Sequence, residues 1–337
     1  MTQRLKKILV TGGAGFIGSE FVRQGVARGY RISVVDKLTY AGDLARIREI
    51  QNRIRFHKAD IRQSDKIGTL LKKERPDVIV HFATETHVDR SILDAKPFFQ
   101  TNVIGTQVLV EAALRHKIKK FIHISTDEVY GEIRRGSFDE QAPLKAGNPY
   151  SASKAAADLL IQAAMRTYRL PAVIIRPSNN YGPWQYPEKF MPVVLLKALN
   201  DQAVPVYGKG QQRREWLHVS DCCRAIFTVM RKGKLGGVYN VSSGQEQNNL
   251  KTARDILRAL NKPEQLIHFV QDRPGHDFRY SLTCRKLKGL GWRPKVKLLA
   301  GIENTVAWNL EHRRWVEGKL RDLEKYWKKV YRPLKKT

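Results

Sequence analysis

The chain has 337 residues, of which 42% are hydrophobic and 9% aromatic, so it can bury a substantial core and is not a disordered chain. Lys and Arg number 61 against 32 Asp and Glu, and the resulting net charge of +29 would attract nucleic acid, an anionic membrane or phosphorylated metabolites. Three cysteines without a C-x-x-C pair exclude a disulfide scaffold and predict no metal site.

The start of the chain carries no predicted targeting segment. It is basic, but the apolar run at residues 8–10 is too short for the core of a signal peptide. Nowhere do 18 apolar residues follow one another, which predicts that no segment crosses a membrane. We therefore expect a cytoplasmic protein.

Short apolar runs alternate with amphipathic stretches through the first half of the chain. The runs predicted as strands are residues 7–11, 31–36, 55–58, 78–82, 121–125 and 173–176. The stretches predicted as helices are residues 16–28, 65–73, 97–115 and 149–168. Such alternation needs right-handed crossovers and gives a parallel sheet with helices on both faces. The predicted fold class is therefore α/β, with a doubly wound, Rossmann-type parallel sheet.

The composition changes after Arg176. Five prolines fall between residues 177 and 205, which predicts an irregular, loop-rich segment there. Further helices are predicted at 219–231, 250–260 and 302–317. The last 53 residues hold 16 Lys and Arg against 5 Asp and Glu, with aromatic residues among them. This end of the chain could contact nucleic acid or a membrane surface, but we favour an amphipathic helix that packs on its own domain.

A glycine-rich turn joins the first predicted strand to the first helix. Its glycines satisfy both G-x-G-x-x-G (Gly13, Gly15, Gly18) and the wider G-x-x-G-x-x-G that begins at Gly12. Such a turn lets the backbone approach a pyrophosphate at the helix N-terminus. Asp36 ends the second strand eighteen residues after Gly18. A carboxylate there hydrogen-bonds the ribose hydroxyls and repels a 2′-phosphate, so NAD is favoured over NADP.

Two further pairs of residues are typical of acid–base chemistry. Tyr150 and Lys154 are four apart in a predicted helix, so they share a face, and a nearby ammonium is expected to lower the pKa of the phenol. Asp127 and Glu128 follow the fifth strand, at the edge of the sheet where active sites of this fold class gather. Adjacent carboxylates repel one another, which makes sense if one is a protonated acid and the other an ionised base. The alternative is a solvated turn at the end of the strand.

Over residues 5–317 the chain resembles the extended short-chain dehydrogenase/reductases, and most closely the dTDP-glucose 4,6-dehydratases. The matching stretches are residues 11–19, 36–42, 87–91, 126–131, 150–154, 178–183, 187–189 and 272–277. The Tyr–Lys pair is common to the superfamily, whereas the Asp-Glu pair after Thr126 occurs in a much narrower group and is generally absent from the related epimerases and decarboxylases. The chain departs from the family pattern at Thr84, Pro177 and Glu215. These departures bear on the identity of the nucleotide and sugar of the substrate more than on the type of reaction.

The resemblance implies a role for each catalytic position. Tyr150 would take the proton of the sugar 4-hydroxyl while NAD accepts hydride from C4, and Lys154 would hold the nicotinamide ribose. Glu128 would remove the C5 proton, and Asp127 would protonate the departing 6-hydroxyl. Thr126 would hydrogen-bond the reacting oxygen. The product would be a 4-keto-6-deoxy sugar.

The resemblance also implies two sets of binding residues. Those expected to contact NAD are Gly12, Gly15, Phe16, Ile17, Gly18, Asp36, Lys37, Leu38, Thr39, Asp60, Ile61, Phe82, Ala83, Thr84, Thr101, Tyr150, Lys154 and Asn180. Those expected to contact the nucleotide-diphosphate sugar are Thr86, Thr126, Asn179, Lys189, Phe190, Pro205, Tyr207, Arg214, Asn249, Arg273 and His276.

The expected organisation is an NAD-binding domain at residues 1–178, to which 213–245 return, and a smaller C-terminal α/β domain for the sugar nucleotide at 179–212 and 246–317. Residues 318–337 form a basic tail. We expect a homodimer, as is common in the family. Alternatives are a UDP-glucose 4,6-dehydratase, a related epimerase or decarboxylase, and, more remotely, a nucleic-acid-associating protein on a Rossmann core.

Overall fold

The computed structural model describes residues 5–331, except for the side chains at 321, 322, 325 and 329. Its centre is a seven-stranded parallel sheet in the order β10-β6-β5-β4-β1-β2-β3. The strands are β1 (Lys7–Thr11), β2 (Arg31–Asp36), β3 (Ile54–Lys58), β4 (Val78–His81), β5 (Lys120–Ile124), β6 (Ala172–Pro177) and β10 (Val238–Val241). The prediction of a doubly wound α/β fold is confirmed.

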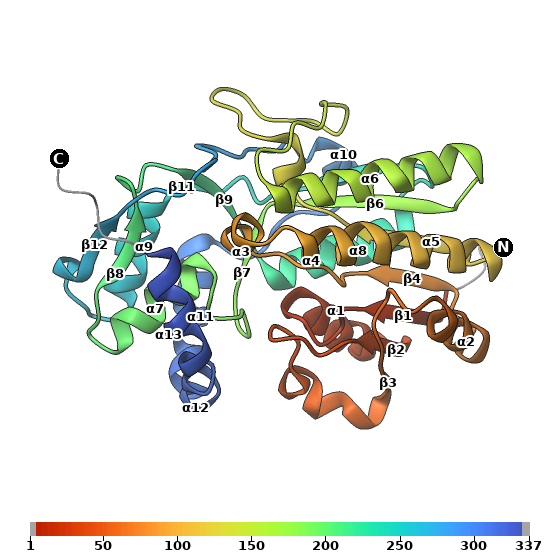
Figure 1. Ribbon diagram of the computed structural model, residues 1–337, viewed down its shortest axis with the longest axis horizontal. Coiled ribbons are helices and arrows are strands. Elements are labelled where there is room, and N and C mark those ends of the chain that lie inside the picture. Colours follow the sequence, from red (N-terminus) through yellow and green to blue (C-terminus); the bar gives the residue numbers. More distant parts are fainter. Residues whose placement is uncertain (1–4, 332–337) are drawn as a thin grey trace.

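Helices cover both faces of this sheet (Figure 1). One layer contains α1 (Phe16–Ala27) and α8 (Val219–Lys232), and the other contains α2 (Ser64–Glu74), α5 (Gly105–Arg115) and α6 (Pro149–Thr167). Successive residues of β1 point to opposite faces, so Ile8 and Val10 join the α1 and α8 core while Leu9 joins the other. Strands buried on both faces explain the nearly continuous apolar runs in the sequence.

The helix predicted at 97–115 is interrupted. A short α4 (Lys96–Phe98) leads into a π-helical segment, η2 (Phe99–Ile104), before α5 begins. The wider turn contains the buried Asn102, whose side chain donates to Ser153 Oγ at 2.8 Å and accepts from Glu85 N at 2.8 Å. Such π-helical segments are frequent next to functional sites.

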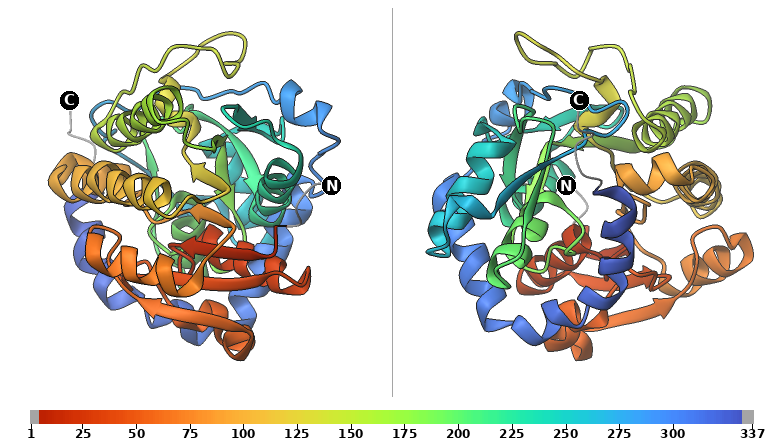
Figure 2. Two further views of the ribbon diagram at one scale, coloured as in Figure 1. Left: turned by 90° about the vertical axis from the view of Figure 1, so that its right-hand side faces the viewer. Right: turned by 60° about the vertical axis from the view of Figure 1, so that its left-hand side comes forward.

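The second half of the chain adds smaller sheets and helices beside the carboxyl ends of the main strands (Figure 2). A three-stranded sheet contains β7 (Asn179–Tyr181), β9 (Arg213–His218) and β11 (Glu246–Asn248), and β8 (Val204–Tyr207) pairs with β12 (Ile267–Val270). The helices in this half are α7 (Phe190–Leu199), α9 (Asn249–Ala259), α10 (Arg285–Gly289), α11 (Leu298–Glu311), α12 (Arg313–Glu317) and α13 (Leu320–Val330), with a 3-10 turn η4 (Glu264–Leu266). The first half contributes a further helix, α3 (Val88–Leu93), and the 3-10 segments η1 (Leu44–Arg53) and η3 (Asp127–Tyr130).

Two predictions concern helices of this half, α7 and α13. The prediction of an irregular segment at 177–205 is wrong for α7, a helix buried on nearly all sides. Pro192 is tolerated because it lies in the first helical turn, where the missing N–H has no partner within the helix. At the carboxyl end, α13 buries Leu323, Tyr326 and Trp327 against α7, so the favoured amphipathic helix is confirmed as far as Val330. The rest of the predicted tail, 332–337, lies outside the described residues. None of the described helices is both long enough and apolar enough to cross a bilayer.

Candidate active site

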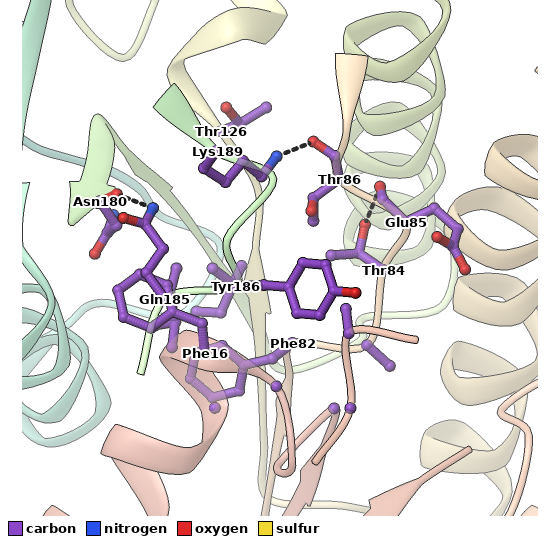
Figure 3. A pocket seen from close by; sticks show the side chains of 18 of the residues that line it. Phe16, Phe82, Thr84, Glu85, Thr86, Thr126, Asn180, Gln185, Tyr186 and Lys189 are labelled. Atoms are coloured by element: carbon purple, nitrogen blue, oxygen red, sulfur yellow. Dashed lines mark hydrogen bonds between the residues drawn. The ribbon is translucent and has the colours of Figure 1, made fainter. Parts of the chain in front are cut away.

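One continuous cavity opens at the carboxyl ends of β1, β2, β4, β5 and β6. It brings together most of the predicted cofactor and catalytic residues and part of the substrate set (Figure 3). The predicted residues that line it are Gly12, Gly15, Phe16, Ile17, Gly18, Asp36, Lys37, Thr39, Asp60, Ile61, Phe82, Ala83, Thr84, Thr86, Thr101, Thr126, Asp127, Glu128, Tyr150, Lys154, Asn179, Asn180, Lys189 and Phe190.

The glycine turn lies at the base of this cavity. A Cβ on Gly12, which has φ +71°, would lie 2.6 Å from the backbone nitrogen of Ala83, and a Cβ on Gly18 would collide with the carbonyl oxygen of Gly12. Gly13 packs against Val34 and does not line the cavity. The wider glycine pattern is therefore the one that faces it. Gly15 caps α1 without a side-chain hydrogen bond, which leaves the first backbone N–H groups of the helix for an anion.

Asp36 is held in place beside this turn. Its carboxylate accepts hydrogen bonds from the backbone N–H groups of Ala14 at 2.9 Å and Leu38 at 2.8 Å. Burial nevertheless raises the pKa of Asp36. The Leu38 side chain does not line the cavity, so this residue contributes through its backbone. Lys37 forms an ion pair with Asp60 at 3.0 Å, which opposes its use for a 2′-phosphate. Turn and carboxylate together fit a dinucleotide without that phosphate.

The acidic pair follows β5 as the first residues of η3. Thr126 caps this turn: its hydroxyl accepts from Glu128 N at 3.3 Å and donates to Asp127 Oδ1 at 3.1 Å. Both carboxyl groups are buried, with 2% of Asp127 and 9% of Glu128 exposed. Asp127 Oδ2 has no hydrogen-bond partner among the described residues, although it is buried. A solvated turn is thus excluded, and an acidic oxygen is left to act on a ligand.

The electrostatic surroundings separate the two acids. Burial raises the pKa of Asp127 well above its usual value, and the charge of Glu128 raises it further. Burial also raises the pKa of Glu128, but the charges of Arg273, Arg214 and Lys189 oppose this. Asp127 is therefore the better candidate for a protonated acid and Glu128 for an ionised base.

Tyr150 and Lys154 lie in the first turns of α6, which begins at the capping box of Asn148 and Ser151. The expected lowering of the Tyr150 pKa is wrong for the protein alone. Burial raises this pKa, and the charge of Glu128 raises it further. Lys154 donates to the carbonyl oxygen of Ile124 at 2.7 Å, and burial lowers its own pKa to about 8. Activation of the phenol thus requires positive charge supplied with the ligands.

The predicted substrate residues divide into two groups. Lys189 lines the cavity and donates to the carbonyl oxygen of Thr86 at 2.7 Å, as Figure 3 shows. Arg214 and Arg273 do not line it but are close enough to affect the pKa of Glu128. The Nε atom of Arg273 is buried and has no hydrogen-bond partner among the described residues. The remaining predicted residues outside the cavity lining are Pro205, Tyr207, Asn249 and His276.

Sequence reasoning missed several residues that line the cavity. Arg46 is 2% exposed and donates to the carbonyl oxygens of Ala14 and Ala41, yet nothing in the sequence distinguishes it from the other basic residues. Tyr186 reaches across the cavity toward Thr84 in Figure 3. Glu188, which accepts from Arg90 at 2.8 Å, belongs to the matching stretch at 187–189 and could have been found there.

Known proteins resemble this chain over most of its length. The family model for GDP-mannose 4,6 dehydratase matches residues 9–305. A dTDP-glucose 4,6-dehydratase from Streptomyces niveus is 49% identical over 321 residues, which cover 92% of this chain and 95% of that protein.

Solved structures show the same relationship. DesIV, a dTDP-glucose 4,6-dehydratase from Streptomyces venezuelae crystallised with NAD, superposes with a TM-score of 0.91 at 43% identity and covers 93% of this chain and 99% of that one. A UDP-glucose 4-epimerase from Thermus thermophilus, also crystallised with NAD, reaches a TM-score of 0.84 at 30% identity, covering 90% of this chain and 98% of its own. Because dehydratases and epimerases share this scaffold, the side chains at the site decide between the two activities.

Proposed function

The chain belongs to the dTDP-glucose 4,6-dehydratase family, and we propose that it is itself an NAD-dependent hydro-lyase that converts dTDP-glucose to dTDP-4-keto-6-deoxyglucose. The observation that carries this proposal is the buried pair Asp127 and Glu128 beside Tyr150 in one cavity. An epimerase needs the tyrosine and the cofactor but no such acid and base, since it eliminates no water. The geometry therefore favours dehydration over epimerisation.

Residues of the chain itself carry out the first proton transfer. NAD+, when bound, supplies the acceptor for the hydride of C4 and the donor that returns it to C6. Tyr150 takes the proton of the sugar 4-hydroxyl, and Lys154 holds the nicotinamide ribose. The ammonium of Lys154 belongs to the next turn of the same helix and is held by the carbonyl oxygen of Ile124 at 2.7 Å. Its charge, together with the positive charge that the oxidised nicotinamide would bring, would stabilise the phenolate.

Elimination is the task of the acidic pair. Oxidation at C4 makes the C5 proton acidic, and Glu128, whose negative charge is supported by nearby cations, removes it. Asp127, which remains protonated because it is buried beside Glu128, gives its proton to the departing 6-hydroxyl. The Thr126 hydroxyl already donates to Asp127, so it fixes that carboxyl group in addition to contacting the sugar oxygen.

The direct test is incubation with dTDP-glucose and, separately, with UDP-glucose, followed by mass spectrometry of the product. We expect loss of one water from dTDP-glucose without net change in NAD, and slower reaction of UDP-glucose. Isomerisation without loss of water would place the protein among the epimerases. Faster turnover of UDP-glucose would support the proposed dehydration but show that the substrate carries uridine instead of thymidine.

We further propose a cytoplasmic homodimer with the two-domain division given above. The return of β10 to the main sheet supports assigning 213–245 to the NAD-binding domain. The exposed side chains of Phe99, Ile104 and Leu159 support an apolar helical interface. Light scattering of the purified protein should give twice the chain mass, and Leu159→Glu should reduce it to one chain mass. A monomer at micromolar concentration would contradict the dimer.

A further inference from the structure

The carboxyl-terminal residues 313–331, here called the C-terminal arm, pack against loops around the active site. The arm comprises α12, α13 and Tyr331. Figure 1 shows α13 beside α7, and the second view of Figure 2 shows it in front of the main sheet. Leu323 is fully buried, and Tyr326 and Trp327 are 8% and 4% exposed. Burial of this kind shows that the arm is packed in place along its length.

Polar contacts fix the arm to the loops around the cavity. At its start, Trp315 Nε1 and Lys319 Nζ both donate to Asp43 Oδ2 at 2.8 Å. Farther along, the Tyr326 hydroxyl meets His87 Nδ1 at 3.0 Å.

Helix α13 also packs against a neighbouring arginine. The guanidinium of Arg90 lies 4.2 Å from the ring centroids of both Tyr40 and Tyr326, and its Nε donates to Glu188, which lines the cavity. Arm and cavity wall are thus joined by a network of partly buried, charged contacts.

This attachment places Tyr331 among the predicted nucleotide residues. Its ring lies 5.4 Å from that of Tyr207, centroid to centroid, with an interplanar angle of 44°. Tyr207 also contacts the ring of His276 at 5.8 Å and donates to Asp89, which pairs with Arg273 at 2.9 Å.

An acidic and a basic side chain both influence the pKa of the Tyr331 hydroxyl. Burial raises its pKa most, Asp89 raises it further, and Arg273 lowers it. The tyrosine is therefore close to the same guanidinium that affects the base Glu128.

These positions define an order along the site. Arg273, Arg214 and Lys189 gather positive charge beside Glu128, where the pyrophosphate of a sugar nucleotide would lie when its sugar reaches the acids. Beyond Arg273 the side chains become aromatic, with Tyr207, His276 and Tyr331 in contact. Rings of this kind are suited to the flat face of a base.

We propose that Tyr331 is a substrate-binding residue supplied by the C-terminal arm, and that its ring forms, with Tyr207, the wall that packs on the pyrimidine nucleoside of the substrate. The inference rests on the proposed function, because it takes the nucleoside diphosphate as the ligand. It gives the arm a role in catalysis through binding, with no part in the chemical steps. Tyr331 then affects KM and leaves kcat nearly unchanged.

The test compares Tyr331→Ala, Tyr331→Phe and the matched control Lys328→Ala, which changes an exposed residue of α13 three positions before Tyr331. Calorimetric titration of the NAD-loaded protein with dTDP measures binding, and dTDP-glucose turnover measures kcat and KM. Removal of an aromatic contact to a base should weaken binding roughly five- to tenfold. We expect Tyr331→Ala to raise both the dTDP Kd and KM by this factor, with kcat within twofold of the unaltered protein.

The two matched variants make the result specific. Tyr331→Phe keeps the ring and should bind like the unaltered protein, as should Lys328→Ala, and all variants should melt at the same temperature. Unchanged or tighter dTDP binding by Tyr331→Ala would overturn the proposal, as would an equal loss in Tyr331→Phe. If the unaltered protein binds dTDP but does not turn over dTDP-glucose, the proposed function fails while the titration still decides the role of Tyr331. Failure of the unaltered protein to bind dTDP would overturn both.

Discussion

Asp127 and Glu128 are neighbours in the chain, yet basic side chains support the negative charge of Glu128 more than that of Asp127. Asp127 is the more deeply buried, and its negative form would stand beside the charge of Glu128. Arg214 lowers the pKa of Asp127 as well, but that of Glu128 is lowered by Arg273, Arg214 and Lys189 together. Two carboxyl groups therefore share a site while their surroundings differ, in the sense that an elimination with one acid and one base requires.

Substitution of either carboxyl group should stop dehydration at a different point. Positioned proton transfer contributes about 10²–10⁴-fold to rate, so both Glu128→Gln and Asp127→Asn should lose activity by about that factor. In deuterated water, Asp127→Asn should still exchange the C5 proton of the substrate, because Glu128 remains, whereas Glu128→Gln should not. NMR of the recovered sugar nucleotide measures this exchange.

The exposed Glu303 on α11 offers a control, since Glu303→Gln should leave turnover unchanged. Exchange by Glu128→Gln that matches the unaltered protein would show that another group takes the C5 proton.

The pH profile of kcat should reflect the raised pKa of Glu128. The base works only when ionised, so activity falls as the pH drops through this pKa, which lies above the ordinary value for glutamate. Arg273 lowers this pKa, so Arg273→Gln should move the acid limb of the profile to higher pH. Measurement at saturating substrate separates this shift from weaker binding. An acid limb that moves to lower pH would contradict the assigned sign.

Tyr150→Phe should abolish oxidation while the protein stays folded. The phenol is the proposed proton acceptor, and its loss should lower kcat by about 10²–10⁴-fold. Tyr150 is 7% exposed and packs with Val88 and Phe98, contacts that phenylalanine retains. The melting temperature should therefore change little. Retention of more than a tenth of the turnover by this variant would show that Tyr150 is not the base.

The glycine turn offers a test of cofactor binding with a matched control. Gly18→Ala would place a Cβ against the carbonyl oxygen of Gly12, and such overpacking costs about 1–3 kcal/mol of stability. NAD affinity, measured by titration, should fall with it because the turn shifts. Gly68 lies in α2, where an added Cβ would face open space, so Gly68→Ala should raise stability by about 0.5–1 kcal/mol. Equal NAD binding by both variants would contradict the role of the turn.

Much of the scaffold follows from local sequence pattern. Strands β1 and β2 have the predicted bounds, because apolar runs buried on both sides end sharply at Thr11 and Asp36. Helix α7 escapes prediction because prolines at 187 and 192 dominate the local pattern, while its burial depends on contacts with α9 and α13.

The residues of the site could be predicted where they belong to a sequence motif, and less well where they do not. Gly12, Gly15 and Gly18 face the cavity as the wider glycine pattern predicts. Arg46 reaches the cavity only through tertiary contacts, which leave no local signal. The predicted direction of the Tyr150 pKa shift is wrong. The four-residue spacing indicates that Lys154 is near, but it does not reveal the burial of Tyr150 or the negative charge of Glu128, which both raise this pKa. Spacing likewise could not place Tyr331 beside Tyr207, since 124 residues separate them.

The central claim is that one site removes water and returns the same hydride within one substrate. The most direct measurement uses dTDP-glucose labelled with deuterium at C4, with NAD-loaded protein and analysis of the product by mass spectrometry and NMR. The account predicts a product lighter by one water with the deuterium at C6. A dehydrated product without deuterium at C6, or a labelled sugar that keeps its water, would contradict it.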